Sequence, residues 1–85
     1  MHILHIYIYI GHATKAREFE EKLQFDKAIL SYRAALKQNK SDPSLWRSVI
    51  RVMQHPQCPT ETLVNNQKLL NAAKSKLKLY QKNEL

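Results

Sequence analysis

The sequence has few of the residues that build tight turns, disulfides and phosphate-binding loops. Its 85 residues include one glycine, three prolines and one cysteine. So few turn-forming residues argue against a β-sandwich or a β-barrel, and a glycine-rich phosphate loop is excluded. A single cysteine excludes an internal disulfide and favours a reducing, intracellular compartment. We expect the cytoplasm, with an organelle or the nucleus left open.

The chain also lacks a long hydrophobic run. Its most apolar stretch, residues 1–10, is too short to span a bilayer, which needs about 20 residues. From Leu4 to Ile10 apolar residues alternate with His and Tyr, as in a strand, but no second strand is visible to pair with it. Three interpretations remain: an extension of the first helix covered by a partner, a strand added to another protein's sheet, or a disordered tail. We favour a segment covered by a partner.

No set of residues has the pattern of a catalytic or metal site. Cys58 has no visible activating base, and His55 with Cys58 supplies two metal ligands where a structural zinc site needs four. Glu18, Glu20 and Glu21 form an acidic cluster on an expected helix, where we predict that they face solvent. The sequence therefore predicts no enzyme, no cofactor, no metal site and no small-molecule ligand.

What the sequence does contain is helical periodicity. Apolar and small residues between positions 25 and 36 recur in steps of three and four, which is one stripe of an amphipathic helix. Ala28 and Ala35 would let a neighbouring helix approach closely, and Tyr32 would fill the space between them.

Boundary signals divide the chain into helices at 11–23, 25–40, 43–55 and 61–82. Asp42 and Pro43 are suited to the start of the third helix, and Thr60 to the cap of the fourth. Residues 24–26 leave room for a short joint only, which favours an antiparallel pair. We therefore predict an all-α fold: one helical domain over 11–85, with about four antiparallel helices after the apolar segment 1–10.

The first helix pair, residues 11–40, resembles the tetratricopeptide repeat, a helix–turn–helix unit of about 34 residues. Trp46 follows His12 at that same period, where a second repeat would open. The resemblance covers residues 12–53 and implies a right-handed stack of helices. The core that we expect is Ala16, Phe19, Phe25, Ala28, Tyr32, Ala35, Leu36, Trp46, Val49, Leu70, Ala73 and Leu77.

The match weakens beyond Pro56, where Thr62 and Asn66 occupy positions expected to hold alanine and an aromatic residue. We therefore expect the last helix to be longer or to pair differently. Proteins with such repeats are typically scaffolds that bind other proteins, often as extended peptides in a concave groove. One variant binds carboxylate tails, but Ala13, Arg17 and Ser48 stand at the corresponding places, so this activity is not implied.

A second resemblance is to the three-helix microtubule-interacting and trafficking domain. Ala16, Phe25, Ala28, Tyr32 and Ala35 fit it, and its last helix looks like residues 70–78. It would imply binding to amphipathic helices of membrane-trafficking proteins. The extra helix between the prolines at 43 and 59 departs from this family.

The net charge of +7 favours anionic partners. Five lysines and no acid lie between Leu63 and Asn83. At 100° per residue we predict four of them on the side opposite the apolar stripe, and the fifth, Lys74, on its flank; the four are Lys68, Lys76, Lys78 and Lys82.

Two hypotheses follow. The chain could be a small helical adaptor, or a subunit of a larger assembly, that binds a partner protein. Alternatively, it could be a basic subunit of a ribonucleoprotein whose lysines contact RNA backbone without reading bases. A solvated lysine face with no function is a third interpretation.

Overall fold

The structure, a computed structural model, describes the backbone of residues 2–84 and the side chains of residues 11–81. Residues 2–84 contain five helices and no strand, which confirms the all-α class. No helix in this range is long and apolar enough to cross a bilayer. The helices are α1 (His2–Glu21), α2 (Phe25–Gln38), α3 (Pro43–Met53), α4 (Thr60–Asn65) and α5 (Gln67–Glu84).

The N-terminal apolar run is helical in its backbone. It forms the first half of α1, so the strand and disordered-tail interpretations are wrong for residues 2–10. The first helix begins at His2 rather than near residue 11. The side chains of this segment, and whatever covers them, lie outside the described residues.

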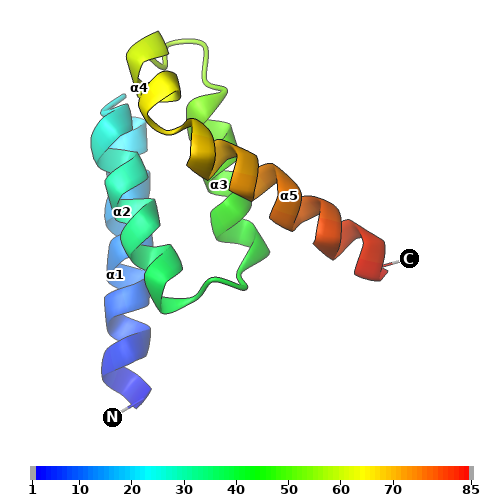
Figure 1. The fold of residues 1–85 in the computed structure, drawn as a ribbon. Coiled ribbons are helices and arrows are strands. Elements are labelled where there is room, and N and C mark those ends of the chain that lie inside the picture. The colour runs from blue at the N-terminus through cyan, green and yellow to red at the C-terminus, as the bar shows by residue number, and fades with distance from the viewer. Residues whose placement is uncertain (1, 85) are drawn as a thin grey trace.

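Helices α1 and α2 lie side by side and run in opposite directions (Figure 1). The turn between them, at residues 22–24, closes α1 with two backbone hydrogen bonds. The Leu23 amide donates to the Glu20 carbonyl at 3.0 Å, and the Gln24 amide donates to the Phe19 carbonyl at 2.8 Å. This is a Schellman motif, whose C′ residue is left-handed and usually glycine. Here that residue is Leu23, with φ of 60°.

Helix α2 packs against α1 on one side and α3 on another, and α5 packs mainly on α3. In Figure 1, α5 crosses α3 diagonally and runs away from α2. A single core cluster draws on α1, α2, α3 and α5. Of the residues expected in it, Phe19 and Leu77 are partly buried and the others are buried. Ile29, Leu45, Val52 and Met53 complete the buried apolar set.

The expected start of α3 is confirmed. The Asp42 carboxylate accepts a hydrogen bond from the Ser44 amide at 2.9 Å, and Pro43 occupies the first turn. Thr60 was predicted to cap the next helix, and this is wrong: Thr60 is the first residue of α4, and its side chain makes no capping hydrogen bond.

The prediction of one continuous helix over 61–82 is also wrong, because the helix breaks at Asn66. The Asn66 amide group donates to the Thr62 carbonyl at 2.9 Å, and the Asn66 carboxamide oxygen accepts a hydrogen bond from Arg33 at 3.1 Å. A side chain that bonds to nearby backbone competes with helix continuation. Thr62 is buried and donates to the Asp26 carboxylate at 2.7 Å, which ties α4 to α2.

The left-handed backbone at Leu23 can be tested by substituting Gly or Ala at Leu23 and, as a control, at Leu30. Replacing Leu23 by Gly should leave the protein about 1 kcal/mol more stable than replacing it by Ala, because only glycine adopts this backbone without steric cost. At Leu30, which is exposed in the middle of α2, the order should reverse by about 1 kcal/mol. Urea unfolding of the four variants measures both differences. The same order at both positions would contradict a left-handed Leu23.

Candidate functional site

A hydrogen-bonded ion pair joins α1, α2 and α3. Arg51 on α3 binds the Glu20 carboxylate of α1 with two hydrogen bonds, of 2.7 Å from Nε and 2.9 Å from Nη2. The Tyr32 hydroxyl of α2 donates to the same carboxylate at 2.9 Å and accepts from Arg51 at 3.2 Å. The prediction that Glu20 faces solvent is therefore wrong, since its side chain is 16% exposed. Glu18 and Glu21 are exposed, as predicted.

This network shifts the pKa values of its members. The Arg51 guanidinium is the main reason that the pKa of Glu20 is lowered from its usual 4.5, against the opposing effect of burial. Burial raises the pKa of Tyr32 above 10.0, and the Glu20 carboxylate adds to that rise. The buried hydroxyl of Tyr32 is thus satisfied inside the core, and the network fixes how the first three helices meet.

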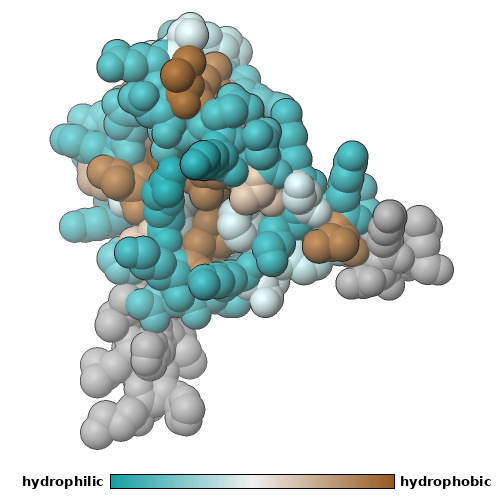
Figure 2. Space-filling view, viewed as in Figure 1, coloured by the Kyte–Doolittle hydropathy of each residue, from teal (hydrophilic) through white to brown (hydrophobic). Residues whose placement is uncertain are grey.

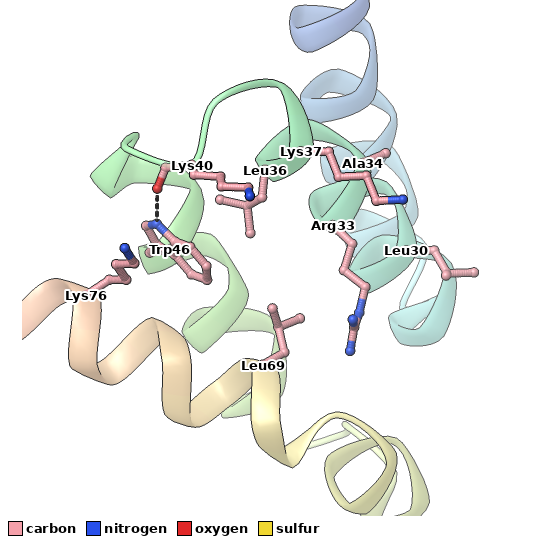
Figure 3. A pocket seen from close by; sticks show the side chains of 9 residues that line it. All are labelled: Leu30, Arg33, Ala34, Leu36, Lys37, Lys40, Trp46, Leu69 and Lys76. Carbon is pink, nitrogen blue, oxygen red and sulfur yellow. Dashed lines mark hydrogen bonds between the residues drawn. The ribbon is translucent and has the colours of Figure 1, made fainter.

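One hollow of the described surface lies between α2 and α5, with α3 behind it, and we call it the α2–α5 groove. Its volume is about 470 Å³ and its surface is mostly apolar. In Figure 2 hydrophobic surface shows near the centre of the molecule between hydrophilic residues, and also in separate patches at the top, the left and the right. The close-up in Figure 3 shows the nine lining residues; the apolar ones are Leu30, Ala34, Leu36, Trp46 and Leu69.

The polar residues that line the α2–α5 groove are all cations. Arg33, Lys37 and Lys40 come from α2 and the residues that follow it, and Lys76 comes from α5 (Figure 3). No Asp or Glu is among the described residues that line it. Arg33 and Lys37 lie one turn apart on α2, and Lys40 follows the end of the helix at Gln38, so the α2 side carries two cations on one helix face and a third just beyond it.

Two hydrogen bonds hold the groove's walls in place. The Trp46 indole is 7% exposed, and its Nε1 donates to the Lys40 carbonyl at 2.8 Å. Arg33 donates to Asn66 at 3.1 Å and so links α2 to the junction of α4 and α5. Leu30, by contrast, is 66% exposed and is not part of the buried core.

The lysines predicted to form one face of the last helix do not all lie together. Lys76 lines the α2–α5 groove from the same face of α5 as Leu69, about two turns further along the helix, and is not opposite the apolar stripe (Figure 3). Lys68, Lys74 and Lys78 are exposed and do not line the groove. The side chain of Lys82 lies outside the described residues.

The other residues singled out in the sequence make structural contacts. The His55 ring packs on Phe25, with ring centroids 5.1 Å apart, and its Nδ1 accepts a hydrogen bond from the Gln57 amide. Burial and the nearby Asp26 carboxylate raise the pKa of the Cys58 thiol, which disfavours the nucleophilic thiolate. Among the described side chains, no three His, Cys, Asp or Glu residues are grouped as a metal site would require.

Ala13, Arg17 and Ser48 come together in the structure. They line one small pocket of about 220 Å³ between the first three helices. Arg17 is its only lining cation among the described residues, and Tyr32 and Leu45 form part of its wall.

The groove cations were missed by sequence reasoning, although a signal for two of them was present. Arg33 and Lys37 share one helix face by spacing alone, and Leu30 is an apolar residue off the buried stripe of α2. Lys40 joins them only because the chain leaves α2 after Gln38. The pairing of Glu20 with Arg51 had no such signal, because the two residues lie far apart in the chain and meet only after α3 packs.

Comparison with known proteins gives no relative: no protein-family model, no curated protein and no solved structure matches this chain. The two family resemblances therefore stay interpretations of the residue pattern.

The Glu20 network gives a pH-dependent prediction. Because the pKa of Glu20 is lower in the folded protein, its contribution to stability is present above pH 4.5 and is lost as the pH falls through the folded-state value. Glu20→Gln should therefore lower the free energy of unfolding by about 1 kcal/mol at neutral pH, and by less as the pH falls below about 4.

Denaturant unfolding across pH measures this difference. Glu18→Gln makes the same chemical change at an exposed site of the same helix and should have little effect at any pH. A deficit in Glu20→Gln that is constant with pH would contradict a charge-dependent contact.

Proposed function

We propose that this chain is a protein-interaction module, a small helical adaptor or a subunit of a larger assembly, that binds a partner protein in the α2–α5 groove. The observation that carries the proposal is an apolar hollow of about 470 Å³ whose polar lining is entirely cationic. Apolar surface supplies binding free energy, and the charges around it select the partner and steer its approach.

Two further features support a partner. A chain of this size buries only about 60–65% of its unfolded surface, so its core is marginal and binding would stabilise it. Leu30 also leaves an apolar side chain in water at the groove edge, where a partner could cover it. Both family resemblances imply protein binding, in an intracellular setting.

A photo-crosslinking residue placed at position 30 tests the proposal. The full chain with benzoylphenylalanine at Leu30 is irradiated in nuclease-treated cell extract, and the crosslinked protein is identified and then purified. The matched control carries the same group at Leu79, which is also exposed and apolar but does not line the groove.

We expect one discrete protein to crosslink at position 30 and not at 79. The purified partner should then bind the unmodified chain and bind Leu30→Glu at least tenfold more weakly, because a charge would enter the apolar contact. Equal crosslinking at both positions, or no loss of affinity in Leu30→Glu, would show that the groove is not the binding site.

Contact with RNA backbone is a second candidate function, favoured by the exposure of Lys68, Lys74 and Lys78 on α5. No described side chain of the groove offers an exposed aromatic platform for bases, so such binding would depend on phosphate contacts. The logarithm of the RNA affinity would then fall linearly with the logarithm of the salt concentration, with a slope of about −0.7 per phosphate contact on single-stranded RNA.

Two charge-matched variants separate the RNA hypothesis from the groove. One replaces Lys68, Lys74 and Lys78 by Gln, and the other replaces Lys37, Lys40 and Lys76 by Gln. If the chain binds RNA through α5, fluorescence anisotropy with single-stranded RNA should show affinity lost in the first variant and retained in the second. Equal losses in both variants would indicate that only net charge matters.

A further inference from the structure

We infer that the occupant of the α2–α5 groove is an acidic amphipathic helix of the partner, with one apolar stripe and carboxylates beside it. This inference rests on the proposed function and names the chemistry of the partner. It depends on three features of the groove: the sign of its charges, their spacing and the burial of its aromatic residue.

Charge complementarity is the first feature. Four cations and no described carboxylate line the groove, so a partner segment that contributes Asp or Glu would neutralise them. A second copy of this chain is disfavoured for the same reason, because each copy has a net charge of +7. Of the four, only Arg33 uses its charged group in a hydrogen bond, and the side-chain ammonium groups of Lys37, Lys40 and Lys76 make no hydrogen bond or ion pair to the described side chains.

The spacing of the cations is the second feature. Arg33 and Lys37 lie one turn apart on the same face of α2, and Lys40 lies just beyond the C-terminal end of this helix. A helix lying alongside α2 with two carboxylates one turn apart would place them opposite Arg33 and Lys37, and a carboxylate near its end would lie close to Lys40. Its apolar stripe would then face Leu36 and Leu69 on the floor between α2 and α5 (Figure 3).

The third feature separates a peptide from a nucleic acid. Bases bind proteins by stacking on exposed rings, whereas Trp46 is 7% exposed and its indole N–H is already bonded to the Lys40 carbonyl. The remaining floor is aliphatic, and aliphatic side chains such as Leu are its natural complement.

Three synthetic peptides about as long as α2, free of Trp and Tyr, test the inference on the full chain. The first has leucines at helical spacing with glutamates beside them. The second has the same composition in a shuffled order without a helical stripe, and the third has Gln in place of every Glu. Trp46, the sole tryptophan, reports binding by its fluorescence.

We expect saturable binding of the first peptide that weakens with salt, and at least tenfold weaker binding of the other two. The double variant Lys37→Gln/Lys40→Gln should lower affinity about 3- to 10-fold, and Leu30→Glu should lower it further without loss of helicity, because residue 30 is exposed. The control Lys74→Gln/Lys78→Gln removes the same charge outside the groove and should change affinity less than about twofold.

The inference is overturned if the shuffled peptide binds as well as the first, or if the control double variant loses as much affinity as the groove variant. It is also overturned if single-stranded RNA displaces the first peptide and crosslinks to position 30, or if the isolated chain is a dimer in which Leu30 is buried. Absence of saturable binding also overturns it. If position 30 still crosslinks to one protein in that case, the groove binds a partner of other chemistry and the proposed function stands. If it does not, both fail.

Discussion

The structure depends on the close packing of α2 between α1 and α3. Ala28 and Ala35 are fully buried, so two helices can approach the α2 backbone at once, and Tyr32 fills the volume between them. The Tyr32 hydroxyl would be costly to bury alone, and its bonds to Glu20 and Arg51 remove that cost. One helix thereby fixes its neighbours on two sides, and its third side remains in contact with solvent.

The solvent-facing side of α2 forms one wall of the α2–α5 groove because of the direction in which α5 runs. The break at Asn66 and the contact of Thr62 with Asp26 hold α4 near the start of α2, and α5 then crosses α3 instead of lying along α2 (Figure 1). A continuous helix over 61–82 would have no such change of direction. The α2–α5 groove is the result, with Trp46 of α3 behind it and cations along both sides.

Sequence reasoning found what depends on local periodicity. The all-α class, the stripe of α2 and the Asp42 cap follow from residue spacing and from capping chemistry that acts within a few residues. It failed where distant groups decide the outcome. Alternation at Leu4–Ile10 did not separate a strand from an extension of the first helix, and the structure confirms that the backbone continues α1 as helix. Glu20 is held away from solvent by Arg51, a residue 31 positions further along the chain. Lys76 was placed wrongly for a different reason, because at about 100° per residue it shares a face of α5 with Leu69 and does not lie opposite the apolar stripe.

The measurement that tests the account most directly is chemical-shift mapping of the ¹⁵N-labelled full chain with the acidic amphipathic peptide. The account predicts shifts at residues 30–40, at the Trp46 indole N–H and at residues 69–76, with α1 and the turn at residues 22–24 unaffected. Shifts confined to α1, or to the amides around Lys68, Lys74 and Lys78 without any at Trp46, would contradict it.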